Sequence, residues 1–247
     1  MTTIVVTGGT GTLGRRVTER LRAEGHDVRV LSRRTQPYAV DLRVGGSVLD
    51  AALAGVETVV HCASAPRGGD EVAAERLIAA ARRAGVGHLV YISIVGVDRV
   101  PLGYYRTKLA VERRIEASGL GWTVLRTTQF HDLLATILGS LAKPPVLLVP
   151  AGVPDQPVEV GEVADRLADL ALAAPAGRVA DMGGPEVRSL DSLARAYLRA
   201  SGRRRAVAQV PLIGRTYRAA RAGGLLTPER AVGRTTFEEY LGRRFGV

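Results

Sequence analysis

Gly8-Gly9-Thr10-Gly11-Thr12-Leu13-Gly14 is the stretch of this 247-residue chain that decides its fold. It follows a β-branched run at 3–7, which predicts a strand, and it opens an amphipathic stretch at 13–24, which predicts a helix. Its glycines fit both G-x-G-x-x-G and the overlapping G-x-x-G-x-x-G. Strand, glycine turn and helix in this order predict a dinucleotide site, because glycine lets the backbone approach a pyrophosphate and the helix N-terminus offers free N–H groups. The alternative is a glycine-rich turn that binds nothing.

The composition is that of a globular protein, with 46% hydrophobic residues. The length fits one α/β domain, or a nucleotide-binding domain with a small appended lobe. A single cysteine, Cys62, excludes an internal disulfide framework and favours a reducing, cytoplasmic compartment. We expect no signal peptide, because no basic segment precedes an apolar one at the start. The longest apolar tract, 133–142, is too short to cross a membrane, so we expect no membrane partner.

The net charge of +10 raises the question of a nucleic-acid partner. Lysine occurs only at Lys108 and Lys143, so 32 of the 34 basic residues are arginine. The arginines are scattered, and the 4% of aromatic residues do not interleave with the one arginine run at 203–205. We therefore expect no nucleic-acid partner and interpret the charge as a solvated surface, with some arginines serving a phosphate-bearing cofactor.

Strand and helix patterns alternate along the chain, which predicts an α/β fold, a Rossmann-type doubly wound parallel sheet. The alternation of strands and helices becomes less regular after Phe130. We therefore divide the chain into a dinucleotide-binding core at 1–126 and a small C-terminal substrate lobe at 127–247, although some elements after 127 could rejoin the main sheet. We expect strands near 3–7, 27–31, 57–61, 88–92, 122–125, 146–149 and 178–182. We expect helices at 13–24, 49–53, 71–84, 105–117, 131–142, 161–173 and 190–200, with a capping box at Thr236 and Glu239.

The end of the second expected strand bears on the choice of dinucleotide. An NAD-preferring site places a carboxylate there for the ribose 2′-hydroxyl, but this chain has Ser32, Arg33 and Arg34. Because guanidinium groups match phosphate geometry, the sequence favours NADP(H) over NAD(H), with Ser32 and Arg33 at the 2′-phosphate. Alternatively, both arginines are ordinary surface residues, which is our interpretation of Arg34.

Two further segments are expected to line the cofactor. Asp41 and Leu42 are placed beside the adenine, with the Asp41 carboxylate accepting from the exocyclic amine, although Asp41 could equally cap the following turn. Cys62, Ala63 and Ser64 follow a strand at the edge of the sheet where ligands bind, and their small size permits close approach of the cofactor. His61, within that strand, is interpreted as a packed histidine.

Tyr104 and Lys108 form Tyr-x-x-x-Lys, which places both side chains on one helical face. A nearby ammonium is expected to lower the pKa of the phenol, so that Tyr104 can serve as general acid to a carbonyl oxygen. Ser93 ends a strand, and its hydroxyl is expected to hold the same oxygen. Tyr-Lys pairs at this spacing also arise by chance, and Tyr105 competes for the acid role. The four histidines show no metal-ligand spacing, so we expect no metal site.

Together these motifs resemble the short-chain dehydrogenase/reductase superfamily, and in particular its atypical, NmrA-like branch of NAD(P)-binding proteins. The similarity extends over nearly the whole chain and includes 91–96, 125–130, 157–164 and 183–185. It implies a Rossmann fold with a C-terminal substrate lobe, Lys108 at the nicotinamide ribose, and Thr127 and Thr128 in the segment that flanks the nicotinamide. The branch also includes non-catalytic proteins that sense the dinucleotide, and the Asn of the classical tetrad has no counterpart here.

The leading hypothesis is an NADP(H)-dependent oxidoreductase that transfers hydride to a small carbonyl, quinone or enone, with Tyr104, Lys108 and Ser93 as its catalytic residues. An apolar pocket wall is expected from Leu133, Leu134 and Ile137. The alternatives are a non-catalytic NADP(H)-sensing regulatory protein, or a nucleotide-sugar epimerase or dehydratase, for which the C-terminal lobe is short. We expect a small-molecule substrate and a monomer or homodimer.

Overall fold

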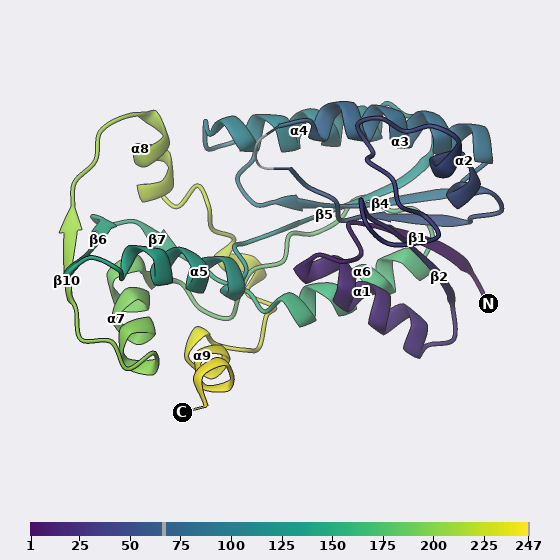
Figure 1. Cartoon of the computed structure of the whole chain (residues 1–247). Coiled ribbons are helices and arrows are strands. Elements are labelled where there is room, and N and C mark those ends of the chain that lie inside the picture. The colour runs from purple at the N-terminus through teal and green to yellow at the C-terminus, as the bar shows by residue number, and fades with distance from the viewer. Residues whose placement is uncertain (66–67, 247) are drawn as a thin grey trace. The chain divides into compact units, whose positions relative to one another are not determined.

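The computed structural model describes residues 1–65 and 68–246 (Figure 1). Within it the chain forms two compact units. Unit 1 comprises Met1–Ser93, Gly103–Arg126 and Gly161–Ala180, and unit 2 comprises Ile94–Leu102, Thr127–Val160 and Asp181–Val247. The chain passes from unit 1 to unit 2 between Arg126 and Thr127, but the later segment Gly161–Ala180 belongs to unit 1.

Unit 1 is built on a six-stranded sheet of order β2-β1-β3-β4-β5-β8. β1 pairs in parallel with both β2 and β3, β3 pairs in parallel with β4, and β5 with β8. The strand order reverses beside β1, which is where ligands bind in open α/β sheets. The strands are β1 (Thr3–Thr7), β2 (Asp27–Leu31), β3 (Thr58–His61), β4 (His88–Ile94), β5 (Gly121–Thr127) and β8 (Gly177–Arg178).

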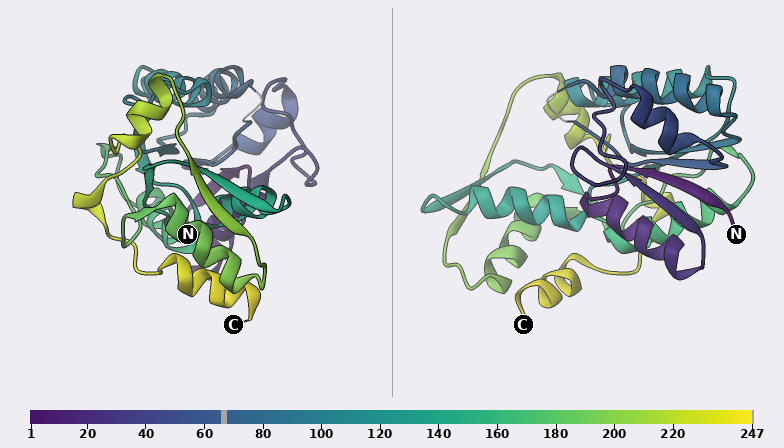
Figure 2. Two further views of the ribbon diagram at one scale, coloured as in Figure 1. Left: turned by 90° about the vertical axis from the view of Figure 1, so that its left-hand side faces the viewer. Right: turned by 45° about the vertical axis from the view of Figure 1, so that its right-hand side comes forward.

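Helices cover both faces of this sheet, as Figures 1 and 2 show. The helices α2 (Ser47–Leu53), α3 (Asp70–Ala84) and α4 (Gly103–Glu116) lie on one face, and α1 (Thr12–Ala23) and α6 (Val160–Leu172) lie on the other. Burial on both faces explains why the central strands are continuous apolar runs: Ile4, Val5 and Val6 of β1 are all fully buried. The predicted doubly wound Rossmann-type sheet is therefore confirmed.

Unit 2 combines short strand pairs with helices. β6 (Val146–Pro150) pairs in parallel with β10 (Ala206–Val210), as the left view of Figure 2 shows, and β7 (Pro154–Asp155) pairs antiparallel with β9 (Arg188–Ser189). Its core lies among α5 (His131–Leu141), α7 (Leu190–Ala200) and α9 (Phe237–Phe245), and includes Leu138, Leu147, Leu193 and Phe237. Two small elements complete the unit, α8 (Arg215–Arg221) and the single-turn helix η1 (Pro228–Arg230).

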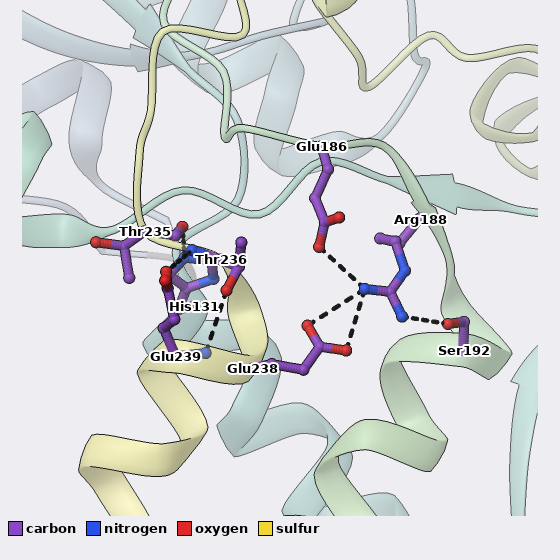
Figure 3. Close-up of polar contacts among 8 residues, drawn as sticks. All are labelled: His131, Glu186, Arg188, Ser192, Thr235, Thr236, Glu238 and Glu239. Carbon is purple, nitrogen blue, oxygen red and sulfur yellow. Dashed lines mark hydrogen bonds and ion pairs between the residues drawn. The ribbon is translucent and has the colours of Figure 1, made fainter.

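Polar contacts fix the ends of the unit 2 helices (Figure 3). The Arg188 guanidinium is bonded to Glu186, Glu238 and Ser192, so it ties β9 to α7 and α9. The predicted capping box is present: the Glu239 N–H donates to Thr236 Oγ1 at 3.2 Å, and the Thr236 N–H donates to Glu239 Oε2 at 2.8 Å. Each bond satisfies an N–H at the start of α9 that would otherwise lack a partner.

The strand expected at 178–182 is only partly correct. β8 ends at Arg178, and Met182 forms an isolated parallel bridge with Thr127 instead. Ser32 and Ala39 form another isolated parallel bridge. Two or three residues of apolar character do not fix the length of a strand, because edge pairing depends on contacts that are distant in sequence. Within the described residues, no helix has the length and apolarity needed to cross a bilayer.

Candidate functional site

The glycine loop after β1 is closed so tightly that two of its glycines cannot be replaced without displacing backbone. Gly8 has a φ of +65°, and a Cβ placed on it would lie 2.8 Å from the Ala63 Cα. A Cβ on Gly14 would lie 2.4 Å from the Gly8 carbonyl oxygen. The Gly11 N–H donates to that same oxygen at 2.9 Å, which closes the turn. Gly8 therefore meets a steric need besides its positive φ, and Gly14 allows α1 to begin close against the loop.

The first backbone N–H groups of α1 lie next to this loop, and no side-chain cap accepts hydrogen bonds from them. Gly11 is the N-cap residue, makes no side-chain capping bond, and is followed by a first turn that contains no acidic residue. Thr10, Gly11 and Thr12 are exposed, whereas Leu13 is buried against the core. Free N–H groups at the positive end of the helix dipole favour an anion such as a pyrophosphate.

The segment after β2 exposes two guanidinium groups, those of Arg33 and Arg34, whereas the Ser32 hydroxyl bonds within the segment. The Ser32 Oγ lies 2.7 Å from the Thr35 hydroxyl and accepts from the Arg34 and Thr35 N–H groups, so it stabilises the local turn. Arg33 is exposed, and its charge helps to lower the pKa of Asp41. At this edge of the sheet Arg33 is thus the stronger candidate for a phosphate, since Ser32 already has local partners.

Asp41 is engaged by its own loop. Its carboxylate accepts from the Arg43 backbone N–H at 2.9 Å and pairs with the Arg43 guanidinium at 2.5 Å. The hydrogen bonds to Arg43 hold the pKa of Asp41 at about 2. These contacts match the turn-capping alternative more directly than a bond to adenine. Leu42 is buried in the core of unit 1, so its side chain packs against protein.

A groove of about 710 Å³ begins at the glycine loop and runs between α1 and β2. Gly9 and Thr10 are the loop residues that border it, and Arg15, Thr35 and Tyr38 continue its walls. It therefore lies on the outer side of the loop, where the adenosine half of a dinucleotide would be expected. Arg15 was not among the residues predicted for the cofactor. Its position directly after Gly14, in the first turn of α1, was the available signal.

The end of β3 adjoins the glycine loop. His61 Nδ1 lies 2.7 Å from the Thr7 hydroxyl, and the His61 ring stacks on Tyr91. His61 is 2% exposed, which confirms it as a packed histidine, and burial, assisted by the Lys108 charge, lowers its pKa to about 3. Burial also raises the pKa of Cys62 to about 12, so this thiol is not a nucleophile at neutral pH.

Lys108 lies inside unit 1, with only 3% of its surface exposed. Its Nζ donates to the Ile92 carbonyl at 2.7 Å and lies 4.3 Å from the centre of the Tyr91 ring. Burial lowers the pKa of Lys108 to about 8, and the nearby Asp70 carboxylate is the largest opposing influence. An ammonium has three N–H donors, so one bond to a carbonyl leaves two for a ligand such as the hydroxyls of a ribose.

Tyr104 bonds to Ser64 and not to Lys108. Its hydroxyl lies 2.5 Å from Ser64 Oγ, just beyond the carboxyl end of β3. Burial raises the pKa of Tyr104, the Asp70 carboxylate raises it further, and the bond to Ser64 lowers it. The expectation that Lys108 lowers this pKa is therefore wrong: four residues of helix bring the two side chains to one face, but the Lys108 ammonium turns inward onto Tyr91.

Ser93 and Tyr105 complete the polar side chains predicted at this edge. Ser93 is 1% exposed, and no residue that the structure describes gives its hydroxyl a hydrogen-bond partner. A buried hydroxyl without a partner is costly, which is consistent with a site kept for a ligand. Tyr105 is buried at 3% exposure, whereas Tyr104 is only partly buried, so Tyr104 is the more accessible phenol.

In unit 2, Thr127 and Thr128 are both buried. The Thr127 carbonyl accepts from the Val95 N–H at 2.9 Å, and the Thr128 hydroxyl accepts from the Gly184 N–H at 3.2 Å. Both residues thus hold neighbouring loops of unit 2. The expected apolar wall is wrong at Leu134, which belongs to the core of unit 2, while Leu133 and Ile137 are 46% and 47% exposed. These two lie on the outer face of α5 because the helical repeat separates them from the buried position.

The residues of unit 1 fit a nicotinamide dinucleotide. A glycine cradle that a Cβ would fill, an uncapped helix N-terminus and a buried ammonium with donors to spare occur along one edge of its sheet. Gly8 touches Ala63, and Ser64, the next residue, bonds to Tyr104, so the loop and the phenol adjoin the same strand end. Over the described part of the chain, no group of His, Cys, Asp and Glu has a metal-binding arrangement.

Comparison with known proteins agrees with this geometry. A family model described as NAD(P)H-binding matches residues 8–143. A (4-alkanoyl-5-oxo-2,5-dihydrofuran-3-yl)methyl phosphate reductase from Streptomyces griseus is 36% identical over 140 residues, which are 51% of this chain and 48% of that reductase. The chain thus matches about half the length of that relative. Quinone oxidoreductase 2 from Escherichia coli is 25% identical over 216 residues, 81% of this chain and 75% of that enzyme.

Among solved structures, the NADPH-dependent quinone oxidoreductase of Escherichia coli in complex with NADPH is similar over 98% of this chain and 99% of its own, with a TM-score of 0.83 and 22% identity. A likeness at this identity concerns the fold. It extends the match beyond the segment covered by the family model.

Proposed function

We propose that this chain, which belongs to the NAD(P)H-binding family, is an NADP(H)-dependent reductase of a conjugated carbonyl compound, of the atypical short-chain dehydrogenase/reductase type. The single observation that carries the proposal is the position of the Lys108 ammonium. It is 3% exposed, it bonds to one carbonyl, and it lies beside the strand end that adjoins the glycine loop. Placing a cation in the interior is costly, and a ligand that takes its remaining N–H donors would offset that cost.

The coenzyme we propose is NADP(H). Exposed Arg33 follows β2, and Arg15 borders the groove on the adenosine side of the loop. Both are guanidinium groups that stay charged at all physiological pH values and suit a 2′-phosphate. The segment 32–34 contains no carboxylate to accept from a 2′-hydroxyl, as an NAD site requires.

In the proposed reaction the bound coenzyme supplies a hydride, and the residues of the chain position it and handle the proton. The glycine loop and the first turn of α1 hold the pyrophosphate through backbone N–H groups. Lys108 donates to the nicotinamide ribose, and Ser93 donates to the substrate oxygen. Tyr104 gives its proton to that oxygen, and its raised pKa keeps the phenol protonated at neutral pH, which suits the reductive direction.

The substrate class we propose is a quinone or enone. One relative is named for reducing an oxo-dihydrofuran that carries an alkanoyl group, and another is named for a quinone. In a conjugated carbonyl, negative charge develops on oxygen as hydride arrives, which is where Ser93 and Tyr104 would act.

The test is NADPH consumption, followed by absorbance, over a panel of quinones, enones and simple ketones. We expect turnover with at least one quinone or enone, and a loss of about 10²-fold or more in kcat when Tyr104 is replaced by Phe. A Tyr217→Phe variant is the matched control, because that hydroxyl bonds to the Ala151 carbonyl in unit 2. Tight NADPH binding with no turnover on the whole panel would contradict a reductase.

A further inference from the structure

Asp70 is a buried carboxylate that the reaction described above does not use. It is the first residue of α3 and is 5% exposed. Its Oδ1 accepts from the Ala65 N–H at 2.5 Å, and its Oδ2 accepts from the Ser64 hydroxyl at 3.2 Å. The same Ser64 oxygen lies 2.5 Å from the Tyr104 hydroxyl. Carboxylate, serine and phenol therefore form one continuous hydrogen-bonded chain within unit 1.

The protons available on these groups determine which group donates each hydrogen bond between Tyr104, Ser64 and Asp70. A serine hydroxyl has one proton and an ionised carboxylate can only accept, so Ser64 donates to Asp70. The Ser64 oxygen must then accept the Tyr104 proton. While Asp70 is ionised, the phenolic proton is turned toward Ser64 and away from any substrate. When Asp70 is protonated the order reverses, Asp70 donates to Ser64, Ser64 donates to Tyr104, and the phenolic proton is released toward a ligand.

The charges around Asp70 support an electrostatic link to the phenol. Its carboxylate raises the pKa values of Tyr104 and Tyr91, and it raises the pKa of Lys108 against the effect of burial. Glu112, on the same helix as Lys108, acts in the same sense on Tyr91 and Lys108. Among the residues that the structure describes, the groups on which this carboxylate is seen to act are therefore one ammonium and two phenols, and Tyr104 is the phenol that shares a hydrogen-bonded chain with it.

We propose that Ser64 and Asp70 are positioning residues that return a proton to Tyr104, and this inference rests on the proposed function of Tyr104 as proton donor. As Tyr104 gives its proton to the substrate oxygen, the Ser64 O–H bond breaks and a new O–H bond forms on Tyr104. The Asp70 carboxylate, which starts ionised, takes up one solvent proton and passes it to Ser64, so it ends ionised again. Each oxygen of the chain loses one proton and gains one, so the net change is one solvent proton delivered to the substrate oxygen.

The experiment measures Tyr104 directly and then measures turnover. The chain is labelled with 3-fluorotyrosine, its tyrosine signals are followed by 19F NMR against pH, and Tyr104→Phe assigns the Tyr104 signal. Asp70→Asn should move the Tyr104 midpoint to lower pH by about half a pH unit or more, because a nearby negative charge is lost. Ser64→Ala should move it to higher pH, and Ser64→Thr, which keeps the hydroxyl, should restore it. Glu71→Gln is the matched control, since that carboxylate is in the same helical turn but pairs with Arg114.

The kinetic readout is the pH profile of kcat with a substrate from the panel. Asp70→Asn and Ser64→Ala should lower kcat about 10-fold, alter the pH dependence and leave KM nearly unchanged, while Ser64→Thr retains most of kcat. Unmoved Tyr104 titrations in both Asp70→Asn and Ser64→Ala would overturn the proposal, and would assign Asp70 to the order of the loop alone. The NMR arm needs no turnover, so an inactive wild-type chain would contradict the proposed function while the relay is still decided.

Discussion

At the scale of single residues, the buried ammonium of Lys108 is expected to bind the coenzyme and to lower the stability of the ligand-free protein. A cation in the interior is held there by one carbonyl and one aromatic face. We expect Lys108→Met to raise the free energy of unfolding of the ligand-free protein at pH 7 by about 1–2 kcal/mol, because the desolvation cost is removed. The same variant should lose coenzyme binding. Chemical denaturation and a coenzyme titration on one preparation measure both, and a variant that is destabilised yet still binds would contradict this account.

The pKa of Lys108 gives the wild-type chain a distinctive pH dependence. Its value is about 8 in the folded protein and 10.5 in its ordinary state. Between these values the unfolded chain retains a proton that the folded chain has released, so stability rises with pH across this window. The full difference corresponds to about 3 kcal/mol. When the unfolding free energies of wild type and Lys108→Met are compared, the advantage of Lys108→Met at pH 7 should disappear or reverse by pH 10.

Arg33 is expected to determine the preference for the phosphorylated coenzyme. We predict that Arg33→Asp loses affinity for NADPH by about 10-fold or more and changes affinity for NADH much less, since a carboxylate repels a 2′-phosphate and accepts from a 2′-hydroxyl. Arg34→Asp, the adjacent exposed guanidinium, is the matched control. Equal losses for the two coenzymes would place Arg33 outside the 2′-phosphate site.

The sequence predicted which residues would gather at this edge better than it predicted their pairings. The glycine register and the alternation of strands with helices are local patterns, and they located the loop and Lys108 correctly on their elements, whereas Tyr104 lies in α4, which begins at Gly103 and not at the expected position 105. Helical spacing suggested that Tyr104 and Lys108 would act on each other, whereas Tyr104 bonds to Ser64 and Lys108 contacts Tyr91. Those partners are 40 and 17 positions away, and no periodicity in one sequence reports contacts of that range.

At the scale of elements, a buried ion pair fixes α4 to β5. Arg126 and Glu112 make two parallel bonds of 2.9 and 2.6 Å, with side chains 5% and 1% exposed. Removing one partner leaves a buried charge, so Glu112→Ala should lower the free energy of unfolding by about 3–5 kcal/mol. Denaturant titration measures the change. Asp50→Ala, which breaks the exposed pair with Arg83, should have a much smaller effect, and similar effects for the two variants would contradict the assignment.

Helices and strands could be predicted where the residues that specify them are close in sequence. They were predicted less well where their length depends on pairing within the sheet. The helix at 190–200 and the capping box at Thr236 were predicted as they occur, because amphipathic spacing and capping residues lie within one element. The third strand of a standard Rossmann half is reduced to the bridge between Ser32 and Ala39, and β8 has only two residues. Their lengths follow from pairing with distant strands, for which the sequence has no local mark.

At the scale of the whole molecule, the charge balance should affect how the coenzyme arrives. A net charge of +10 attracts an anion over a distance that salt reduces. We expect affinity for NADPH to fall more steeply with ionic strength than affinity for NADH, because the additional phosphate interacts with the arginine-rich surface. Fluorescence titrations at about 0.02 M and about 0.5 M salt measure the affinity for each coenzyme, and the change of affinity with ionic strength is then compared between NADPH and NADH. Parallel slopes would argue that neutral contacts dominate binding of both coenzymes.

We expect the glycine loop of unit 1 to bind a nicotinamide dinucleotide with a 2′-phosphate. Isothermal titration calorimetry of the folded chain with NADPH and NADH tests it most directly, with Gly14→Ala as the variant that places a Cβ against the Gly8 carbonyl and Gly87→Ala as a control with ordinary clearance. We expect saturable binding of NADPH that is tighter than binding of NADH. This binding should be abolished in Gly14→Ala and should persist in Gly87→Ala. Absence of saturable heat with either coenzyme on well-folded wild-type protein would contradict it.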